Sequence, residues 1–148
     1  MEKSIEIIDI LCENFNLESR EIATYSPLTL AYVGDAIYEL VIRTIIVSKG
    51  NAQVNKLHHK SSNLVKAETQ AKMIRYLAEN EELEDDEMSV YKRGRNAKSY
   101  TSAKNASIGD YRAATGFEAL MGYLYMTGKT DRMNELIKKS LKIAGMEI

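Results

Sequence analysis

The sequence contains a single cysteine, Cys12, and a single proline among 148 residues. One cysteine excludes an intrachain disulfide, which fits a protein of the reducing cytosol. The N-terminus lacks a basic region followed by an apolar run, so we expect no secretory signal. The most apolar stretch, residues 28–47, contains Asp35, Glu39 and Arg43. These charges argue against a membrane span, and we expect a cytoplasmic protein without a membrane partner.

Charge of neither sign dominates, because the net charge at neutral pH is −1. Taken alone, this balance argues against a nucleic-acid-binding protein. The distribution is nevertheless uneven. Residues 49–75 carry six Lys and Arg against one acid, residues 92–109 carry five and no acid, and residues 79–87 carry seven acids and no base. Two positive segments on one surface would attract a polyanion despite the neutral total.

Alternating patterns typical of strands are weak, whereas apolar residues recur at helical spacing. We therefore predict an all-α fold, with one domain over residues 1–148. Ser26 and Pro27 are expected to begin a long helix, because serine caps free N–H groups and proline suits the first helical position. The expected helices span about residues 4–16, 27–47, 61–78, 85–93, 110–126 and 130–145, and residues 94–109 read as a loop. Thr130 and Asp131 are expected to cap the last helix.

Two acids lie in unusually apolar helical segments. Asp35 follows Gly34 in the middle of the long helix, and both residue types are unfavourable there, which suggests a site. Glu118 is flanked on both sides by small and apolar residues. If the two carboxylates meet, their oxygens would suit Mg²⁺ or Mn²⁺, which can activate water and neutralise charge on a phosphodiester. A structural role, with each acid paired to an arginine or a backbone group, remains equally compatible with the spacing alone.

Four segments, in order, resemble the ribonuclease III family. Residues 30–40, LAYVGDAIYEL, resemble its signature helix, and residues 117–125, FEALMGYLY, resemble its second catalytic helix. Residues 57–62 and 92–99 resemble more narrowly Mini-ribonuclease III, the short bacterial branch without a separate double-stranded-RNA-binding domain. The resemblance covers about residues 28–141 and leaves the N-terminal helix outside the matched motifs.

The resemblance implies an all-α homodimer that hydrolyses both strands of an RNA duplex and leaves 5′-phosphates. It implies that Asp35 and Glu118 bind Mg²⁺, with Mn²⁺ as a substitute, and that the substrate is the large-subunit (23S) ribosomal RNA precursor. The family in general has a further acid at the positions of Ala31 and Thr115. Because the Mini branch also lacks these acids, we expect an active enzyme whose metal ion binds more water. A ribosomal protein as a partner would be compatible, although nothing in the sequence shows one.

The positive segment at residues 92–109 is the best candidate for RNA contact. A chain without an appended RNA-binding domain must hold the duplex with its catalytic domain. The residues expected to contact phosphate or 2′-OH groups are Lys92, Arg93, Arg95, Asn96, Lys98 and Lys104. His59, Lys60 and Ser61 form a second candidate contact, at an expected helix start where free N–H groups favour phosphate. Without the resemblance, a solvated loop that balances the acidic segment is the simpler interpretation.

Several alternatives remain open. Glu39 is expected to pair with Arg43 one turn on, and a supporting role at the site is the alternative for Glu39 and for Thr115. The absence of the two family acids also fits a non-catalytic scaffold that binds RNA or ribosomes. The acidic run at residues 81–85 raises a third function, nucleotide pyrophosphohydrolysis, although acids also favour a solvated helix start.

Overall fold

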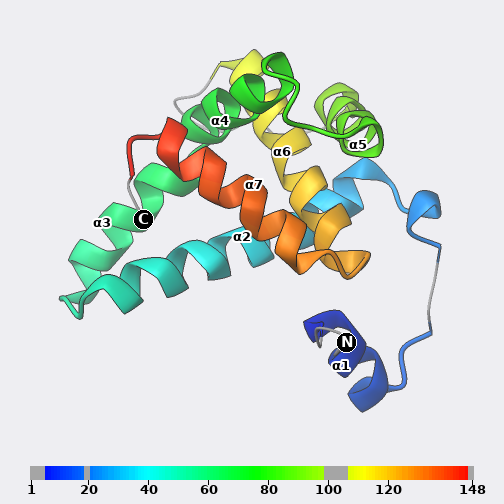
Figure 1. The fold of residues 1–148 in the computed structure, drawn as a ribbon, viewed down its shortest axis with the longest axis horizontal. Coiled ribbons are helices and arrows are strands. Elements are labelled where there is room, and N and C mark those ends of the chain that lie inside the picture. Colours follow the sequence, from blue (N-terminus) through cyan, green and yellow to red (C-terminus); the bar gives the residue numbers. More distant parts are fainter. Residues whose placement is uncertain (1–5, 19–20, 99–106, 147–148) are drawn as a thin grey trace.

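The computed structural model describes residues 6–18, 21–98 and 107–146, and within these ranges it contains helices and no strand (Figure 1). The predicted all-α fold is therefore confirmed. The elements are α1 (Ile7–Phe15), the 3-10 helix η1 (Ile22–Thr24), α2 (Pro27–Lys49), α3 (Val54–Val65), α4 (Ala67–Glu79), α5 (Asp85–Asn96), α6 (Ile108–Met126) and α7 (Thr130–Ile143). The start of α2 is as predicted, because the Ser26 side chain accepts a hydrogen bond from the Thr29 N–H at 3.1 Å.

Helix α6 lies at the centre of the fold, with α2, α4, α5 and α7 packed around it (Figure 1). Ten of its nineteen residues are buried, as expected for a helix that is apolar on nearly every side. Phe117 of α6 meets Tyr38 of α2 edge to face, with the ring centroids 5.0 Å apart. The core therefore holds α2 and α6 in a fixed relation, and these are the helices that carry Asp35 and Glu118.

Two glycines allow the backbones of α2 and α6 to touch. A Cβ atom at Gly34 would overlap the carbonyl oxygen of Glu118, and one at Gly122 would overlap the carbonyl oxygen of Leu30. Only glycine fits where two helix backbones approach this closely. Gly34 precedes Asp35 in the chain, so the same crossing that requires Gly34 also brings Asp35 beside Glu118.

Helix α5 extends further than predicted. It runs to Asn96, so Gly94 and Arg95 are helical rather than part of a loop. Gly94 is buried against α6, where an added Cβ would lie 2.8 Å from the Cα of Gly116. The glycine signalled a loop, but its physical role is a close helix contact. Helix α6 also starts earlier than predicted, at Ile108, because the Ser107 side chain accepts from the Asp110 N–H at 3.0 Å.

The predicted helix over residues 61–78 is wrong, because two helices occupy this region. Helix α3 already begins at Val54, and Lys66 interrupts the path with an extended backbone (φ −67°, ψ 151°) before α4 begins. No proline or glycine marks this break, so the sequence contains no local signal for it. At the last helix, Thr130 is the first helical residue rather than the cap, and its hydroxyl donates to the carboxylate of Glu6.

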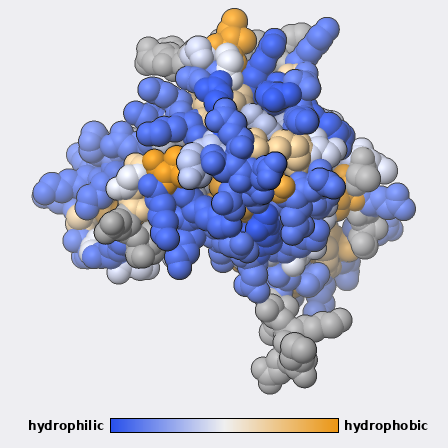
Figure 2. All heavy atoms as spheres, turned by 45° about the horizontal axis from the view of Figure 1, so that its top comes forward, coloured by the Kyte–Doolittle hydropathy of each residue, from blue (hydrophilic) through white to orange (hydrophobic). Residues whose placement is uncertain are grey.

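The surface carries few large apolar groups on the face drawn in Figure 2, where hydrophilic side chains dominate and hydrophobic ones form small separate patches. Helix α1 is different, since none of its residues is buried, and Ile7, Ile10 and Phe15 are exposed. Within the described ranges, no helix is long and apolar enough to cross a membrane.

Candidate active site

Asp35 and Glu118 meet where α2 crosses α6. The two carboxyl groups lie within hydrogen-bonding reach of each other, with Asp35 exposed to solvent and Glu118 half-buried. Burial, followed by the hydrogen bond and the negative charge of Asp35, raises the pKa of Glu118 to about 9. At neutral pH Glu118 is therefore protonated, because two adjacent carboxylates cannot both stay ionised without a compensating charge.

This pair suits a hard divalent cation. A cation would replace the proton that the pair shares, since it supplies the charge that both ionised carboxylates need. Two carboxylates facing a water-accessible edge match Mg²⁺, which keeps several waters and binds few protein oxygens. In the part of the chain that the structure describes, no group of three or more His, Cys, Asp or Glu residues is placed to hold a metal. The two acids would therefore be the main protein ligands at this site.

The two weaker candidates have structural partners. Glu39 accepts a hydrogen bond from the Arg43 guanidinium at 2.6 Å, so the predicted ion pair is confirmed. Its negative charge also contributes to the raised pKa of Glu118, which places Glu39 in the electrostatic field of the site. Thr115 is buried, and its hydroxyl donates to the carbonyl of Tyr111 at 3.0 Å.

A third residue at the site, Gln70, was missed by the sequence analysis. It comes from α4 and is 1% exposed, its Nε2 donates to the Val65 carbonyl at 2.9 Å, and its side-chain amide acts to lower the pKa of Glu118, against the larger effects of burial and Asp35. Tyr38 of α2 also lies near the site. Burial, and after it the charge of Glu118, raise the pKa of the Tyr38 hydroxyl. Gln70 lies 48 positions from Glu118 along the chain, and only the packing of α4 on α6 brings them together.

The basic residues of α5 border a hollow between α4, α5 and the start of α6. Lys92 and Arg95 line it together with Arg75 of α4 and Arg112 of α6, two arginines that the sequence analysis did not select. The Arg95 guanidinium also lies over the Tyr91 ring, 5.4 Å from its centroid. The structure thus adds two cations from other helices to the predicted α5 segment.

The remaining α5 candidates form the outer side of this basic surface. Asn96 lines the first hollow as well, and together with Lys92 and Arg93 it lines a second hollow beside α5. Lys98 is exposed just after the helix end. Lys104 lies outside the described residues.

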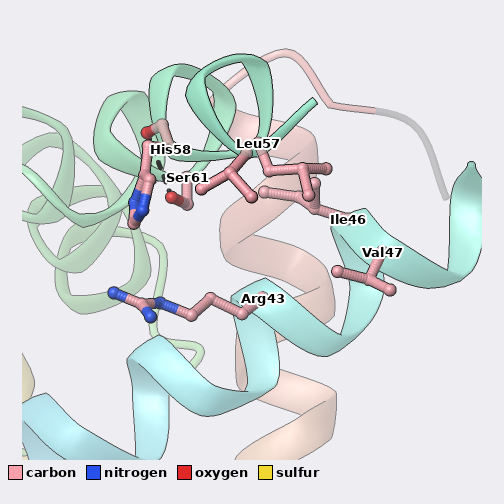
Figure 3. A pocket seen from close by; sticks show the side chains of 7 residues that line it. Arg43, Ile46, Val47, Leu57, His58 and Ser61 are labelled. Carbon is pink, nitrogen blue, oxygen red and sulfur yellow. Dashed lines mark hydrogen bonds between the residues drawn. The ribbon is translucent and has the colours of Figure 1, made fainter. Parts of the chain in front are cut away.

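His59, Lys60 and Ser61 do not lie at a helix start, so that part of the prediction is wrong. All three are inside α3, where N–H groups are already bonded within the helix. Ser61 is buried, and its hydroxyl donates to the His58 carbonyl at 3.1 Å, beside a small apolar pocket between α2 and α3 (Figure 3). His59 and Lys60 are exposed. They remain available for an RNA contact through their side chains alone.

The acidic run has a structural explanation. Glu87 is buried and receives two hydrogen bonds from the Arg132 guanidinium, both at 2.8 Å. Glu82 accepts from Lys139 at 2.7 Å. Glu84 and Glu87 form a capping box at the start of α5. These acids join α5 and its preceding turn to α7, which gives no support to a pyrophosphohydrolase site.

Known proteins are similar to this chain over most of its length. The Ribonuclease III domain model matches residues 28–129, which include both carboxylates. Mini-ribonuclease 3 of Clostridium tetani is 51% identical over 120 residues, or 80% of this chain and 78% of that protein. Mini-ribonuclease 3 of Enterococcus faecalis is 48% identical over 126 residues, or 85% and 96%. A crystal structure of a Fusobacterium nucleatum protein superposes with a TM-score of 0.75 at 28% identity, covering 84% of this chain and 99% of the other. The chain therefore belongs to the ribonuclease III family, in its Mini-ribonuclease III branch.

Proposed function

We propose that this endoribonuclease cleaves double-stranded RNA with Mg²⁺ held by Asp35 and Glu118, in one catalytic domain over residues 1–148. The observation that carries the proposal is the meeting of these carboxylates from α2 and α6, where burial and the neighbouring Asp35 raise the pKa of Glu118. A half-buried acid that needs a compensating charge, beside a solvent-exposed acid, is an arrangement suited to a cation and a phosphate.

The residues of the chain have separate tasks in this reaction. A bound divalent cation would supply an activated water and neutralise charge that develops on the phosphodiester. Asp35 and Glu118 would fix the position of the cation relative to the helices, because both residues lie where the backbones of α2 and α6 touch. Ala31 and Thr115 add no carboxylate, so water and RNA phosphate oxygens would have to supply the other ligands of a bound cation.

The basic surface of α5 is proposed to hold the duplex through its phosphates. We expect Lys92→Ala and Arg95→Ala each to weaken duplex binding uniformly across sequences. Each lost phosphate contact should reduce the slope of log K against log salt by about 1. Binding is measured by fluorescence anisotropy at several salt concentrations, in a Glu118→Gln background that prevents cutting.

Lys138→Ala is the matched control for this measurement. Lys138 is an exposed lysine of α7, outside the basic surface. If log K depends on log salt with the same slope in all three variants and in the parent protein, Lys92 and Arg95 do not contact the RNA phosphates. A loss restricted to one RNA sequence would indicate base readout instead, which the deep major groove of A-form RNA disfavours.

A homodimer is proposed from the uncovered face of α2. This helix buries residues along only one side. Tyr32, Leu40 and Val47 are 82%, 55% and 53% exposed, and their spacing places them on one face of the helix. A second copy would cover this apolar face, and each protomer would supply one carboxylate pair for one RNA strand.

The proposed substrate is the large-subunit (23S) ribosomal RNA precursor, and the second candidate function is a non-catalytic RNA- or ribosome-binding scaffold. The absence of acids at Ala31 and Thr115 is the observation that raises the scaffold as an alternative. Purified protein is incubated with Mg²⁺ and a stem from this precursor, and with an unrelated duplex of equal length. We expect 5′-phosphate products, with preferred cutting of the precursor stem. Binding of both duplexes without any product would favour the scaffold, and equal cutting of both would contradict the substrate assignment.

A further inference from the structure

The basic hollow, which lies between α4, α5 and the start of α6, collects positive charge from three helices. Its lining contains one acid, Glu79, and four cations, Arg75, Lys92, Arg95 and Arg112. In the described ranges no acid forms an ion pair with Lys92 or Arg112, and both side chains are exposed. Exposed cations that no carboxylate neutralises attract phosphate groups, so the hollow is suited to an RNA backbone.

Arg95 is already held in place for such a contact. Its Nε donates to the Asn96 side-chain oxygen at 3.3 Å, and its guanidinium lies over the Tyr91 ring, 5.4 Å from the ring centroid. Within the part of the chain that the structure describes, the two terminal NH2 groups of Arg95 have no hydrogen-bond partner. A guanidinium stacked on a ring loses little conformational freedom on binding, and its free N–H groups can take a phosphate.

Arg75 differs from the other cations of the hollow, because a carboxylate already occupies its guanidinium. Its Nη1 donates to Oδ1 of Asp110, in the first turn of α6, at 2.6 Å. The two side chains are 44% and 24% exposed, so solvent and ligands reach the pair. An arginine guanidinium binds carboxylate and phosphate oxygens in the same geometry. The Asp110 carboxylate therefore fills a position that an RNA phosphate could take.

The Arg75–Asp110 pair lies close enough to the candidate active site to meet the same duplex. Asp110 precedes Glu118 by eight residues in α6, which corresponds to about 12 Å along the helix axis. An RNA duplex carries a phosphate charge for about every 1.7 Å of its axis on the values for B-DNA, so a bound duplex presents several phosphates over that distance.

We propose that RNA binding exchanges the partner of Arg75, so that a backbone phosphate displaces the Asp110 carboxylate, and that Arg112 contacts a phosphate of the same duplex. This inference rests on the proposed function, because it presupposes that a duplex lies on the basic surface. Asp110 is then an internal competitor, which lowers the affinity for the RNA backbone. An exposed ion pair contributes little to stability, so a phosphate can replace it.

Two simpler roles of Asp110 make different predictions. A purely structural role, through the favourable position of an acid at a helix start, predicts that removal of its charge does not strengthen RNA binding. General repulsion between a negative side chain and RNA predicts stronger binding whether or not Arg75 is present. Asp85 is the matched control, because it is also an exposed aspartate in a first helical turn and lines the second hollow beside α5. In the described ranges it forms no ion pair with Arg75.

The test is a double-mutant cycle measured by fluorescence anisotropy with one RNA duplex, in the full chain with Glu118→Gln to prevent cutting. We expect Asp110→Asn to tighten binding by about two- to fivefold, the range for release of an exposed ion pair. In an Arg75→Ala background the same change should have no effect, since the two residues act together. Asp85→Asn should have the same effect in both backgrounds. Arg75→Ala and Arg112→Ala should each lower the slope of log K against log salt by about 1.

Three outcomes would overturn the inference. If Asp110→Asn tightens binding equally with and without Arg75, Asp110 acts only as a negative charge. If Asp110→Asn leaves binding unchanged or weakens it, Asp110 does not compete with RNA. If Arg75→Ala keeps the parent slope, Arg75 does not contact a phosphate. Circular dichroism checks the fold of each variant, and Arg75→Gln, which keeps most of the side chain, replaces Arg75→Ala if that variant unfolds. If the Glu118→Gln protein binds no duplex at all, the proposed function itself fails.

Discussion

Replacing Asp35 by Asn, or Glu118 by Gln, is expected to reduce RNA cleavage by about a thousandfold or more while duplex binding persists. Each change keeps the shape of the side chain but replaces a carboxyl group by an amide, which cannot ionise to bind the cation. The metal contributes several kcal/mol of charge stabilisation to phosphodiester cleavage, and each 1.4 kcal/mol is about a factor of ten in rate. Single-turnover cleavage of a labelled duplex measures the rate, and anisotropy measures binding.

Asp131→Asn is the control for this loss. Asp131 is an exposed acid in the first turn of α7, outside the site, and its removal should leave the rate unchanged. A near-normal rate in either site variant would show that the carboxylate pair is not catalytic. If RNA binding disappeared along with cleavage, the variants would have damaged the RNA surface instead, and the assignment of separate roles would be wrong.

Gly34→Ala is expected to destabilise the whole domain by about 3 kcal/mol or more, the upper end of overpacking effects. The new Cβ would overlap the carbonyl oxygen of Glu118, and its other near neighbours are also backbone atoms of α6. Backbone atoms cannot move aside as a flexible side chain can, so α2 and α6 must separate. Thermal unfolding followed by circular dichroism measures the effect.

Gly50→Ala provides the comparison. Gly50 has an extended backbone, with φ at 164°, and a Cβ there would meet nothing within 4 Å. This variant should unfold at nearly the same temperature as the parent. If Gly34→Ala unfolds at the parent temperature as well, the two helices are not in backbone contact, and the geometry that joins Asp35 to Glu118 is incorrect.

The sequence predicted the helices that carry the site, because their apolar residues recur strongly and Ser26 marks a start. It also identified Asp35 and Glu118 as acids in unusually apolar helical segments. The resemblance to ribonuclease III then implied that the two acids act together. The interpretation of Gly34 was incomplete. The sequence analysis took Gly34 as a residue that destabilises the helix and so indicates a functional site. Its direct role is to let the backbones of α2 and α6 touch.

The features that the sequence did not predict depend on packing between distant segments. Gln70 reaches Glu118 only because α4 folds back onto α6, and no local pattern marks it. Lys66 interrupts a helical run without a neighbouring proline or glycine, so no local pattern marks this break. Arg75 and Arg112 join the basic hollow from two other helices. Gly94 indicated a loop in the sequence, whereas in the structure it lies inside α5 and allows a close contact with Gly116 of α6.

The most direct test of the central claim compares four reactions of the parent protein. An RNA duplex and its separated strands are each incubated with Mg²⁺ or with a chelator, and the products are separated on a denaturing gel. If Asp35 and Glu118 bind a catalytic cation that acts on paired RNA, products form only from the duplex with Mg²⁺. Cleavage of the duplex in the chelator, equal cleavage of the single strands, or no cleavage in any reaction would contradict the claim.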